Sequence, residues 1–138
     1  MGTIVVDSSA LLALLFLEDD AGQIATKIAD SDEIFISAVS YAEAGIVLDN
    51  RQYPSKNSND LDELIETFAG EIIALDKEQA KIARIAYQKF GKGKHPAKLN
   101  MGDCFSYALA KQMNVPLLYK GDDFSKTDIT SALQRQDK

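Results

Sequence analysis

The chain has 138 residues, the length of one ordinary domain, so we expect a single domain over residues 1–138. Hydrophobic residues make up 46% and charged residues 26% of the sequence, a balance that excludes an intrinsically disordered protein. The net charge is −6, whereas a protein that binds nucleic acid by overall attraction is usually basic. Any contact with nucleic acid therefore needs a local basic patch or a partner.

The composition also bears on location. The longest apolar run, residues 10–17, has about half the length that a membrane-spanning helix needs. No basic region precedes this run, so we do not expect a secretory signal peptide. Cys104 is the only cysteine, which excludes an internal disulfide and suits a reducing compartment. We expect a cytoplasmic protein without membrane association.

Short apolar runs alternate with helical patterns along the chain. The expected strands cover residues 3–6, 33–36, 71–75 and 116–119. The expected helices cover residues 10–17 (capped by Ser8 or Ser9), 21–29, a segment from Ser37 or Ser40 to Leu48, 61–68, 76–90 (capped by Asp76) and 101–113 (capped by Asn100). Loops are expected at residues 53–56 and 91–98, and a short turn or strand from Thr127 onward. Strands separated by helices predict an α/β fold with a mainly parallel sheet covered on both faces.

Acidic residues stand where this sheet would end. Asp7 directly follows the first strand, and Asp122 and Asp123 follow the fourth. Asp103 lies in the first turn of the helix that enters the fourth strand, and Glu43 lies about two turns into the helix that leaves the second. Because ligands bind at the carboxyl ends of parallel strands, we expect these acids to share one pocket.

A pocket of several carboxylates has a chemical consequence. The carboxylates repel one another unless a cation holds them together. Oxygen ligands of this kind suit Mg²⁺ or Mn²⁺, which can activate a water for phosphodiester cleavage. Each acid taken alone also has an ordinary structural explanation, since Asp7 and Asp103 are placed to cap helices and Glu43 is placed on a helix surface.

Four segments resemble the motifs of PIN-domain nucleases, and they follow one another in the family's order. The segments are residues 4–10 (IVVDSSA), 36–43 (ISAVSYAE), 99–110 (LNMGDCFSYALA) and 117–124 (LLYKGDDF) followed by residues 127–129. The last is similar to the closing motif of the VapC toxin branch. The resemblance covers nearly the whole chain and implies a three-layer α/β/α fold. It also implies an Mg²⁺- or Mn²⁺-dependent ribonuclease, the toxin of a type II toxin–antitoxin pair.

The resemblance carries over to individual residues. Asp7, Glu43 and Asp103 match the family's metal-binding acids. The fourth acid is Asp122 or Asp123, and Asp122 is preferred because it lies nearer the end of the strand. Ser8 or Ser9 is expected to assist, because small polar residues follow the first acid in the family. The resemblance further implies a homodimer and a VapB-like antitoxin whose bound segment blocks the acidic pocket.

The densest basic stretch begins at the end of the expected helix 76–90 and continues through the loop after it. It contains Lys89, Lys92, Lys94 and Lys98 together with His95, the only histidine. Two interpretations stay open: a solvated loop, or a contact with the RNA phosphate backbone. His95 is expected to be solvated rather than catalytic, and Cys104 to pack in the core.

Two other enzyme or signalling functions on the same type of fold are disfavoured by the residues around Asp7. A phosphatase with an aspartate nucleophile is disfavoured because Ser9 stands where its second aspartate is expected. A receiver domain is disfavoured because Val6 and Ser8 flank Asp7, where that fold has an adjacent acidic pair. The remaining alternative is a non-catalytic RNA- or protein-binding module on a PIN-like fold.

Overall fold

The computed structural model describes residues 2–50 and 56–133. Four strands, β1 (Thr3–Val6), β2 (Glu33–Ser37), β3 (Glu71–Ile73) and β4 (Leu117–Leu118), form one parallel sheet in the order β3-β2-β1-β4. The central strand β1 aligns Ile4 with Ile34 of β2 and Val6 with Leu118 of β4. The carboxyl ends of all four strands therefore lie at the same edge of the sheet.

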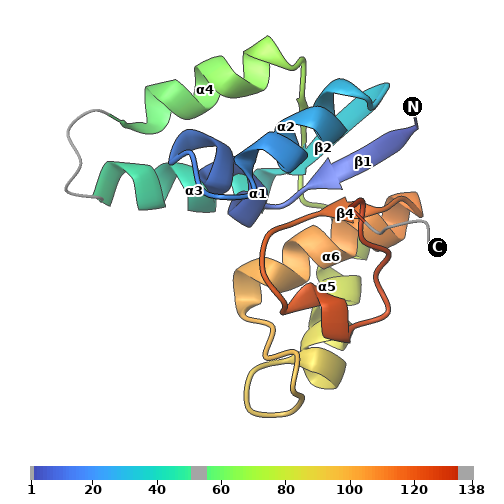
Figure 1. Ribbon diagram of the computed structural model, residues 1–138. Helices are drawn as coiled ribbons and strands as arrows, with labels where there is room; N and C mark the ends of the chain where they lie inside the picture. The colour runs from blue at the N-terminus through green and yellow to red at the C-terminus, as the bar shows by residue number, and fades with distance from the viewer. Residues whose placement is uncertain (1, 51–55, 134–138) are drawn as a thin grey trace.

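Helices cover both faces of this sheet (Figure 1). One face is covered by α1 (Ser8–Leu15), α2 (Ala21–Ala29), α3 (Ala38–Asn50) and α4 (Ser58–Thr67), and the other by α5 (Lys77–Phe90) and α6 (Met101–Met113). Side chains alternate along β1, so that Ile4 and Val6 pack in the first of two core clusters and Val5 packs in the second. The predicted three-layer α/β/α arrangement with a parallel sheet is confirmed.

Several elements begin or end at other residues than the sequence predicted. For the helices, the capping residues explain where each one begins. Helix α1 begins at Ser8 because Asp7 is its N-cap, so the prediction that Ser8 or Ser9 caps it was wrong. Helix α4 begins at Ser58, where a capping box joins Asn57 and Asp60. Asp76 and Asn100 cap α5 and α6, as predicted from the sequence.

The strands at the two edges of the sheet are shorter than predicted. Strand β3 ends at Ile73, after which Ala74 and Leu75 are exposed, and β4 comprises only Leu117 and Leu118. The chain after β4 forms a 3₁₀ turn (Phe124–Lys126) and returns to the sheet through a single bridge between Leu117 and Ser131. Residues 53–55 of the expected loop and residues 134–138 of the tail lie outside the described ranges.

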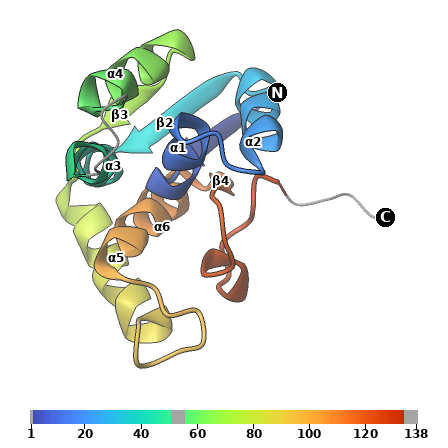
Figure 2. The same ribbon diagram turned by 60° about the vertical axis from the view of Figure 1, so that its left-hand side comes forward.

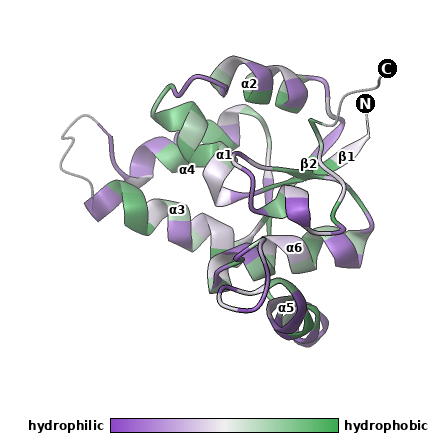
Figure 3. Ribbon diagram, turned by 60° about the horizontal axis from the view of Figure 1, so that its bottom comes forward, coloured by the Kyte–Doolittle hydropathy of each residue, from purple (hydrophilic) through white to green (hydrophobic). Residues whose placement is uncertain are grey.

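The hydropathy of the ribbon follows this layering. Figure 3 shows hydrophobic residues on α1 and α4, which lie against the first core cluster, and hydrophilic residues on α5 at the edge of the molecule. Within residues 2–50 and 56–133, no helix combines the length and the apolar character that crossing a bilayer requires.

Candidate active site

Asp7 lies at the centre of the carboxyl edge of the sheet. Its backbone N–H donates to the carbonyl of Leu118, 2.9 Å away, which ties the end of β1 to the end of β4. Its side chain is 2% exposed, and Oδ2 accepts the backbone N–H of Ser9 at 3.0 Å as the cap of α1. The structural role of Asp7 and its proposed role as a ligand are compatible, because a carboxylate oxygen that accepts one hydrogen bond keeps a second lone pair.

A chain of buried hydroxyl groups holds the other oxygen of Asp7. Ser106 Oγ donates to Asp7 Oδ1 at 2.5 Å, and Ser106 Oγ lies 2.6 Å from Ser40 Oγ. Both serines are fully buried. From the sequence, Ser40 was expected only as a possible start of the helix that ends at Leu48, and no role was predicted for Ser106. The available signal for Ser106 was its position three residues after Asp103 on α6, which places both side chains on neighbouring faces of the helix.

Glu43 reaches the same region from α3. Ser8 Oγ donates to Glu43 Oε1 at 3.0 Å, so Ser8 holds the second acid beside the first. The carboxylate lies directly against Gly102, where an added Cβ would be 2.4 Å from Oε2 and 2.7 Å from Oε1. Burial raises the pKa of Glu43, the hydrogen bond from Ser8 lowers it, and the charge of Asp7 raises it further.

Asp103 completes a capping box at the start of α6. Its N–H donates to Asn100 Oδ1 at 2.8 Å, and its Oδ2 accepts the N–H of Asn100 at 3.0 Å. The pKa of Asp103 is nevertheless raised to about 7. Burial is the main cause, the Asn100 backbone opposes it, and the charges of Asp7, Asp123 and Glu43 add to it. Three carboxylates from three other segments of the chain thus act on Asp103 at this edge.

The fourth carboxylate comes from the loop after β4. Both Asp122 and Asp123 are exposed, and the charge of Asp123 is the one of the pair that raises the pKa of Asp103. The Asp122 carbonyl instead accepts hydrogen bonds from the backbone and side chain of Ser125, at 3.1 and 2.6 Å. The effect on Asp103 is an argument for Asp123, and the preference for Asp122 as the fourth acid stays a prediction.

The start of this loop is fixed to α1. Lys120 N donates to Ser9 Oγ at 2.9 Å, and Lys120 Nζ pairs with Glu18 at 2.5 Å and with Asp20 at 3.6 Å. Ser9 therefore positions the loop that carries Asp123, whereas Ser8 positions Glu43. The two serines have separate structural tasks beside the acids.

The donor set fits a hard divalent cation that keeps some of its water. In residues 2–50 and 56–133, no cage of three or more His, Cys, Asp or Glu residues is placed so that it could hold a metal ion. Mg²⁺ characteristically binds through one or two carboxylates and retains several waters, so it does not require such a cage. An Asp103 with a pKa of about 7 is also a group that a cation would stabilise in its charged form.

The four lysines of the predicted basic stretch are all exposed: Lys89 lies near the end of α5, and Lys92, Lys94 and Lys98 lie in the loop after it. His95 differs from its prediction, because it is half-buried, accepts the Ala97 N–H at Nδ1 and packs edge-on against Phe90. It orders the loop rather than being simply solvated. Cys104 is buried in the second core cluster, as predicted. The loop, seen at the far end of α5 and α6 in Figure 2, leads directly into Asn100 and the helix that carries Asp103.

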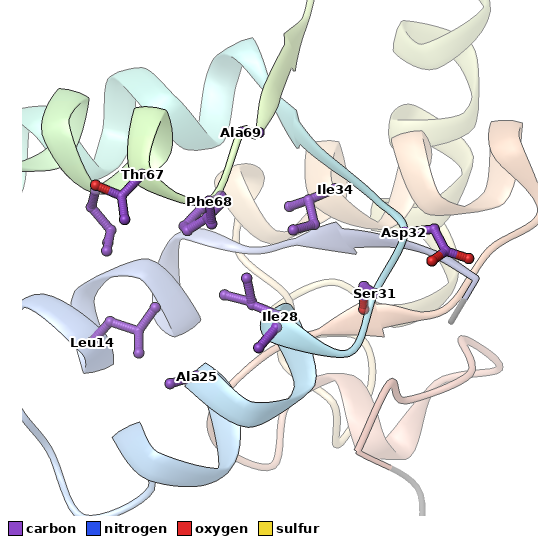
Figure 4. Close-up of a pocket in the computed structure, with 11 residues that line it drawn as sticks. Leu14, Ala25, Ile28, Ser31, Asp32, Ile34, Thr67, Phe68 and Ala69 are labelled. Atoms are coloured by element: carbon purple, nitrogen blue, oxygen red, sulfur yellow. The ribbon is translucent and has the colours of Figure 1, made fainter.

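A separate apolar groove of about 490 Å³ lies away from these acids. Side chains of α1, α2 and the end of α4 face one another across it (Figure 4). Its lining includes Leu14, Ala25, Ile28, Ile34, Leu64 and Phe68. Ile34 lies near the start of β2, whereas the acids lie at the carboxyl ends of the strands, so this groove is not the candidate active site.

Comparison with known proteins agrees with this geometry. The PIN domain family matches residues 4–129. Ribonuclease VapC28 of Mycobacterium tuberculosis is 48% identical over 133 residues, which cover 96% of this chain and 99% of that protein. Ribonuclease VapC of Mycolicibacterium smegmatis is 42% identical over 127 residues, 92% of this chain and 98% of that protein.

Solved structures show the same fold. Mycobacterium tuberculosis VapC20, a toxin that cleaves the sarcin–ricin loop, superposes with a TM-score of 0.74 at 15% identity, covering 92% of this chain and 96% of that chain. VapBC2 from Rickettsia felis, bound to a DNA fragment from its promoter, gives a TM-score of 0.70 at 15% identity, covering 94% of this chain and 96% of that chain. With the family match over most of the sequence and relatives this similar, the chain belongs to the PIN-domain family, among the VapC ribonucleases.

Proposed function

We propose that the protein is a divalent-metal-dependent ribonuclease that acts as the toxin of a toxin–antitoxin pair, with residues 1–138 forming one nuclease domain. The observation that carries the proposal is the group formed by Asp7, Glu43, Asp103 and Asp123, in which the other three charges act on Asp103 at the carboxyl edge of the sheet. Its relatives bear the name ribonuclease, which supports the reaction class. The free, buried Cys104 is consistent with the cytoplasm as the proposed location.

The chain's own residues would prepare the site for catalysis. A bound Mg²⁺ or Mn²⁺ would supply Lewis acidity and a more acidic water for phosphodiester hydrolysis. Asp7 is held at both oxygens, by Ser106 and by the start of α1, so it offers a fixed ligand. With a pKa of about 7, Asp103 would have to release its proton to bind a cation as a charged carboxylate. Ser8 keeps Glu43 turned toward Asp7.

The loop lysines are proposed to contact the RNA. Lys89, Lys92, Lys94 and Lys98 are exposed, and the loop that carries the last three precedes the helix of Asp103. Lysines bind phosphate as point charges and carry little base specificity, so their contribution is expected to be similar for RNAs of different sequence.

The partner is proposed to be a VapB-like antitoxin, because several structural neighbours are toxin–antitoxin complexes. The apolar groove between α1, α2 and α4 suits one face of an amphipathic antitoxin helix. An Arg or Lys beyond that helix could then pair with Asp7, Glu43 and Asp103 and block the site. Ala25→Glu, at an exposed position of the groove, should weaken antitoxin binding without changing cleavage by the free toxin. Gln23→Glu on the same helix is the control for added charge, and equal effects of both changes would exclude the groove.

A homodimer is also proposed. Ile46 on α3 is 59% exposed and Met101 at the start of α6 is 72% exposed. Ile46 lies one turn beyond Glu43, and Glu43 contacts Gly102, so these apolar side chains flank the same junction of α3 with α6. Light scattering should give twice the mass of 15.1 kDa for the wild type. Ile46→Lys should shift the protein toward the monomer, and an unshifted dimer would place the interface elsewhere.

The proposed reaction is tested with protein purified away from its partner. Total RNA is incubated with Mn²⁺, with Mg²⁺, or with a chelator, and the RNA ends are sequenced. New ends at defined positions, present only with metal, are expected. Binding of RNA without any new ends under either metal would instead indicate the non-catalytic binding module.

A further inference from the structure

Positive charge is concentrated in one segment of this acidic chain. Residues 77–98, which comprise α5 and the loop after it, contain seven of the 15 Lys and Arg residues but only one of the 21 Asp and Glu residues. The segment has a net charge of +6, and the rest of the chain has −12. The chain is therefore acidic overall, with a net charge of −6, but contains one strongly basic segment.

The cations on α5 lie on the face opposite the core. Its buried residues are Gln79, Ala83, Ala86 and Phe90, at the spacing of one helical face. Lys77, Lys81 and Arg84 recur every three or four residues on the other side of the helix, and all three are exposed. At 1.5 Å per residue they span about 10 Å along the helix.

Among the described residues these cations form no ion pairs, and Lys89 alone lies over an aromatic ring, with Nζ 5.4 Å from the centroid of Phe90. Elsewhere in the described chain, Lys111 pairs with Asp128 and Lys120 pairs with Glu18. None of the seven cations of residues 77–98 forms an ion pair within residues 2–50 and 56–133. Like charges three or four residues apart destabilise a helix, so Lys77, Lys81 and Arg84 work against α5 unless an anion binds there.

The basic face is continuous in sequence with the candidate active site. Helix α5 ends at Phe90, the lysine loop follows, and Lys92 N and Leu99 N donate to the carbonyls of Leu99 and Phe90 to close it. Asn100 then caps the helix that carries Asp103. An anionic strand would therefore be attracted to α5 and the loop, which precede the helix of Asp103 in the chain. The acidic remainder of the chain would repel the strand.

We propose that the outer face of α5, formed by Lys77, Lys81 and Arg84, is an RNA-binding surface that extends the loop lysines and holds the phosphate backbone of the substrate beside the acids. The inference rests on the proposed ribonuclease function. The spacing of the cations suits a single strand lying along the helix, and the contacts are to phosphates, so the surface adds affinity without base specificity.

The test compares Lys81→Gln/Arg84→Gln with the charge-matched control Lys27→Gln/Lys56→Gln, whose lysines lie on α2 and before α4. Gln is a good helix former, so α5 is retained. All proteins carry Asp7→Asn so that a single-stranded RNA is bound but not cut, and affinity is measured at several salt concentrations. The slope of log affinity against log salt should fall by about 1.4 for the α5 variant, from about 0.7 for each phosphate contact on a single strand.

The control should keep the slope of the parent protein. In the cleaving background, the α5 variant should raise KM several-fold and leave kcat unchanged. The proposed RNA-binding surface is contradicted if the α5 variant and the control have the same slope. It is also contradicted if the parent protein does not bind RNA. If the slope is reduced in the α5 variant but the wild-type protein cuts no RNA at any metal concentration, the RNA-binding surface is supported and the ribonuclease function is contradicted. The failure of one proposal can therefore be told apart from the failure of the other.

Discussion

Ser106 and Asp7, 99 residues apart in sequence, are joined by a hydrogen bond from Ser106 Oγ to Asp7 Oδ1 in the buried centre of the molecule. Ser40 Oγ lies 2.6 Å from Ser106 Oγ, so residues of both α6 and α3 help to orient Asp7. Outer partners of this kind fix a metal ligand in one orientation and are costly to lose. The relationship gives Ser106 a positioning role that its residue type alone does not suggest.

Ser106→Ala is therefore expected to reduce metal affinity about 10- to 100-fold. It leaves Asp7 Oδ1 and Ser40 Oγ without this partner, which should also lower the free energy of unfolding by about 1–3 kcal/mol. Ser40→Ala keeps the bond to Asp7 and should reduce Mn²⁺ affinity less. Calorimetric Mn²⁺ titration of both variants checks this, and equal affinities in Ser106→Ala and wild type would remove the positioning role.

Gly102→Ala separates activity from stability. Its Cβ would be 2.4 Å from Glu43 Oε2, so the carboxylate must move. Cleavage should fall about tenfold or more, since small displacements of a reacting group are expensive. The melting temperature should be unchanged or higher, because Ala favours a helix over Gly by about 1 kcal/mol. Gly22→Ala on α2, where a Cβ meets nothing within 4 Å, is the control and should cleave normally.

The two aspartates after β4 should differ in importance. The charge of Asp123 acts on Asp103, whereas Asp122 engages Ser125 through its carbonyl. Asp123→Asn is expected to lower the cleavage rate more than Asp122→Asn, and to lower the pKa of Asp103 in the metal-free protein. Rates at matched Mn²⁺ and an NMR titration of Asp103 measure both effects. A larger loss in Asp122→Asn would support the assignment drawn from the sequence.

Much of this arrangement could be predicted from the sequence, because hydrophobic periodicity and capping residues are local signals. They identified the four strands, the helices and the caps Asp76 and Asn100, and the parallel sheet then brought Asp7, Glu43 and Asp103 to one edge. The choice between Asp122 and Asp123 could not be made from local signals, because contacts distant in sequence fix the loop that carries them. Gly121 turns the loop at φ +98°, and Lys120 is anchored to Ser9 of α1 and to Glu18 beyond it, both more than 100 residues away in sequence.

The buried serines were beyond prediction for a similar reason. Serine is common at helix starts and on surfaces, and nothing local shows that Ser40 and Ser106 meet in the core. The role of Gly102 could not be predicted either, because the group that leaves no room for a Cβ there is Glu43, on another helix.

Stability of the metal-free protein should depend on pH through Asp103. Its pKa is about 7 in the folded state, and an unfolded Asp titrates near about 3.9. Between these values the folded protein binds a proton that the unfolded chain does not, so the free energy of unfolding falls as the pH rises. The melting temperature should decline from about pH 5 to about pH 8, and Mn²⁺ should offset the decline by favouring the charged carboxylate.

Asp103→Asn is the comparison for that experiment, because it removes this one carboxyl group and leaves the other titratable groups of the chain in place. The variant should show a flatter profile over this range and little stabilisation by Mn²⁺. A decline of the same size in both proteins would mean that another group controls the pH dependence.

The central claim is that Asp7 and its neighbouring carboxylates hold the metal with which RNA is cut. The most direct measurement is RNA cleavage by wild type and Asp7→Asn at matched, saturating Mn²⁺, with circular dichroism to confirm that both are folded. The expected result is a metal-dependent wild type and a folded Asp7→Asn protein that cleaves at least about 100-fold more slowly, a loss at or beyond the upper end for outer partners. Cleavage by Asp7→Asn at a rate near that of the wild type would contradict the account.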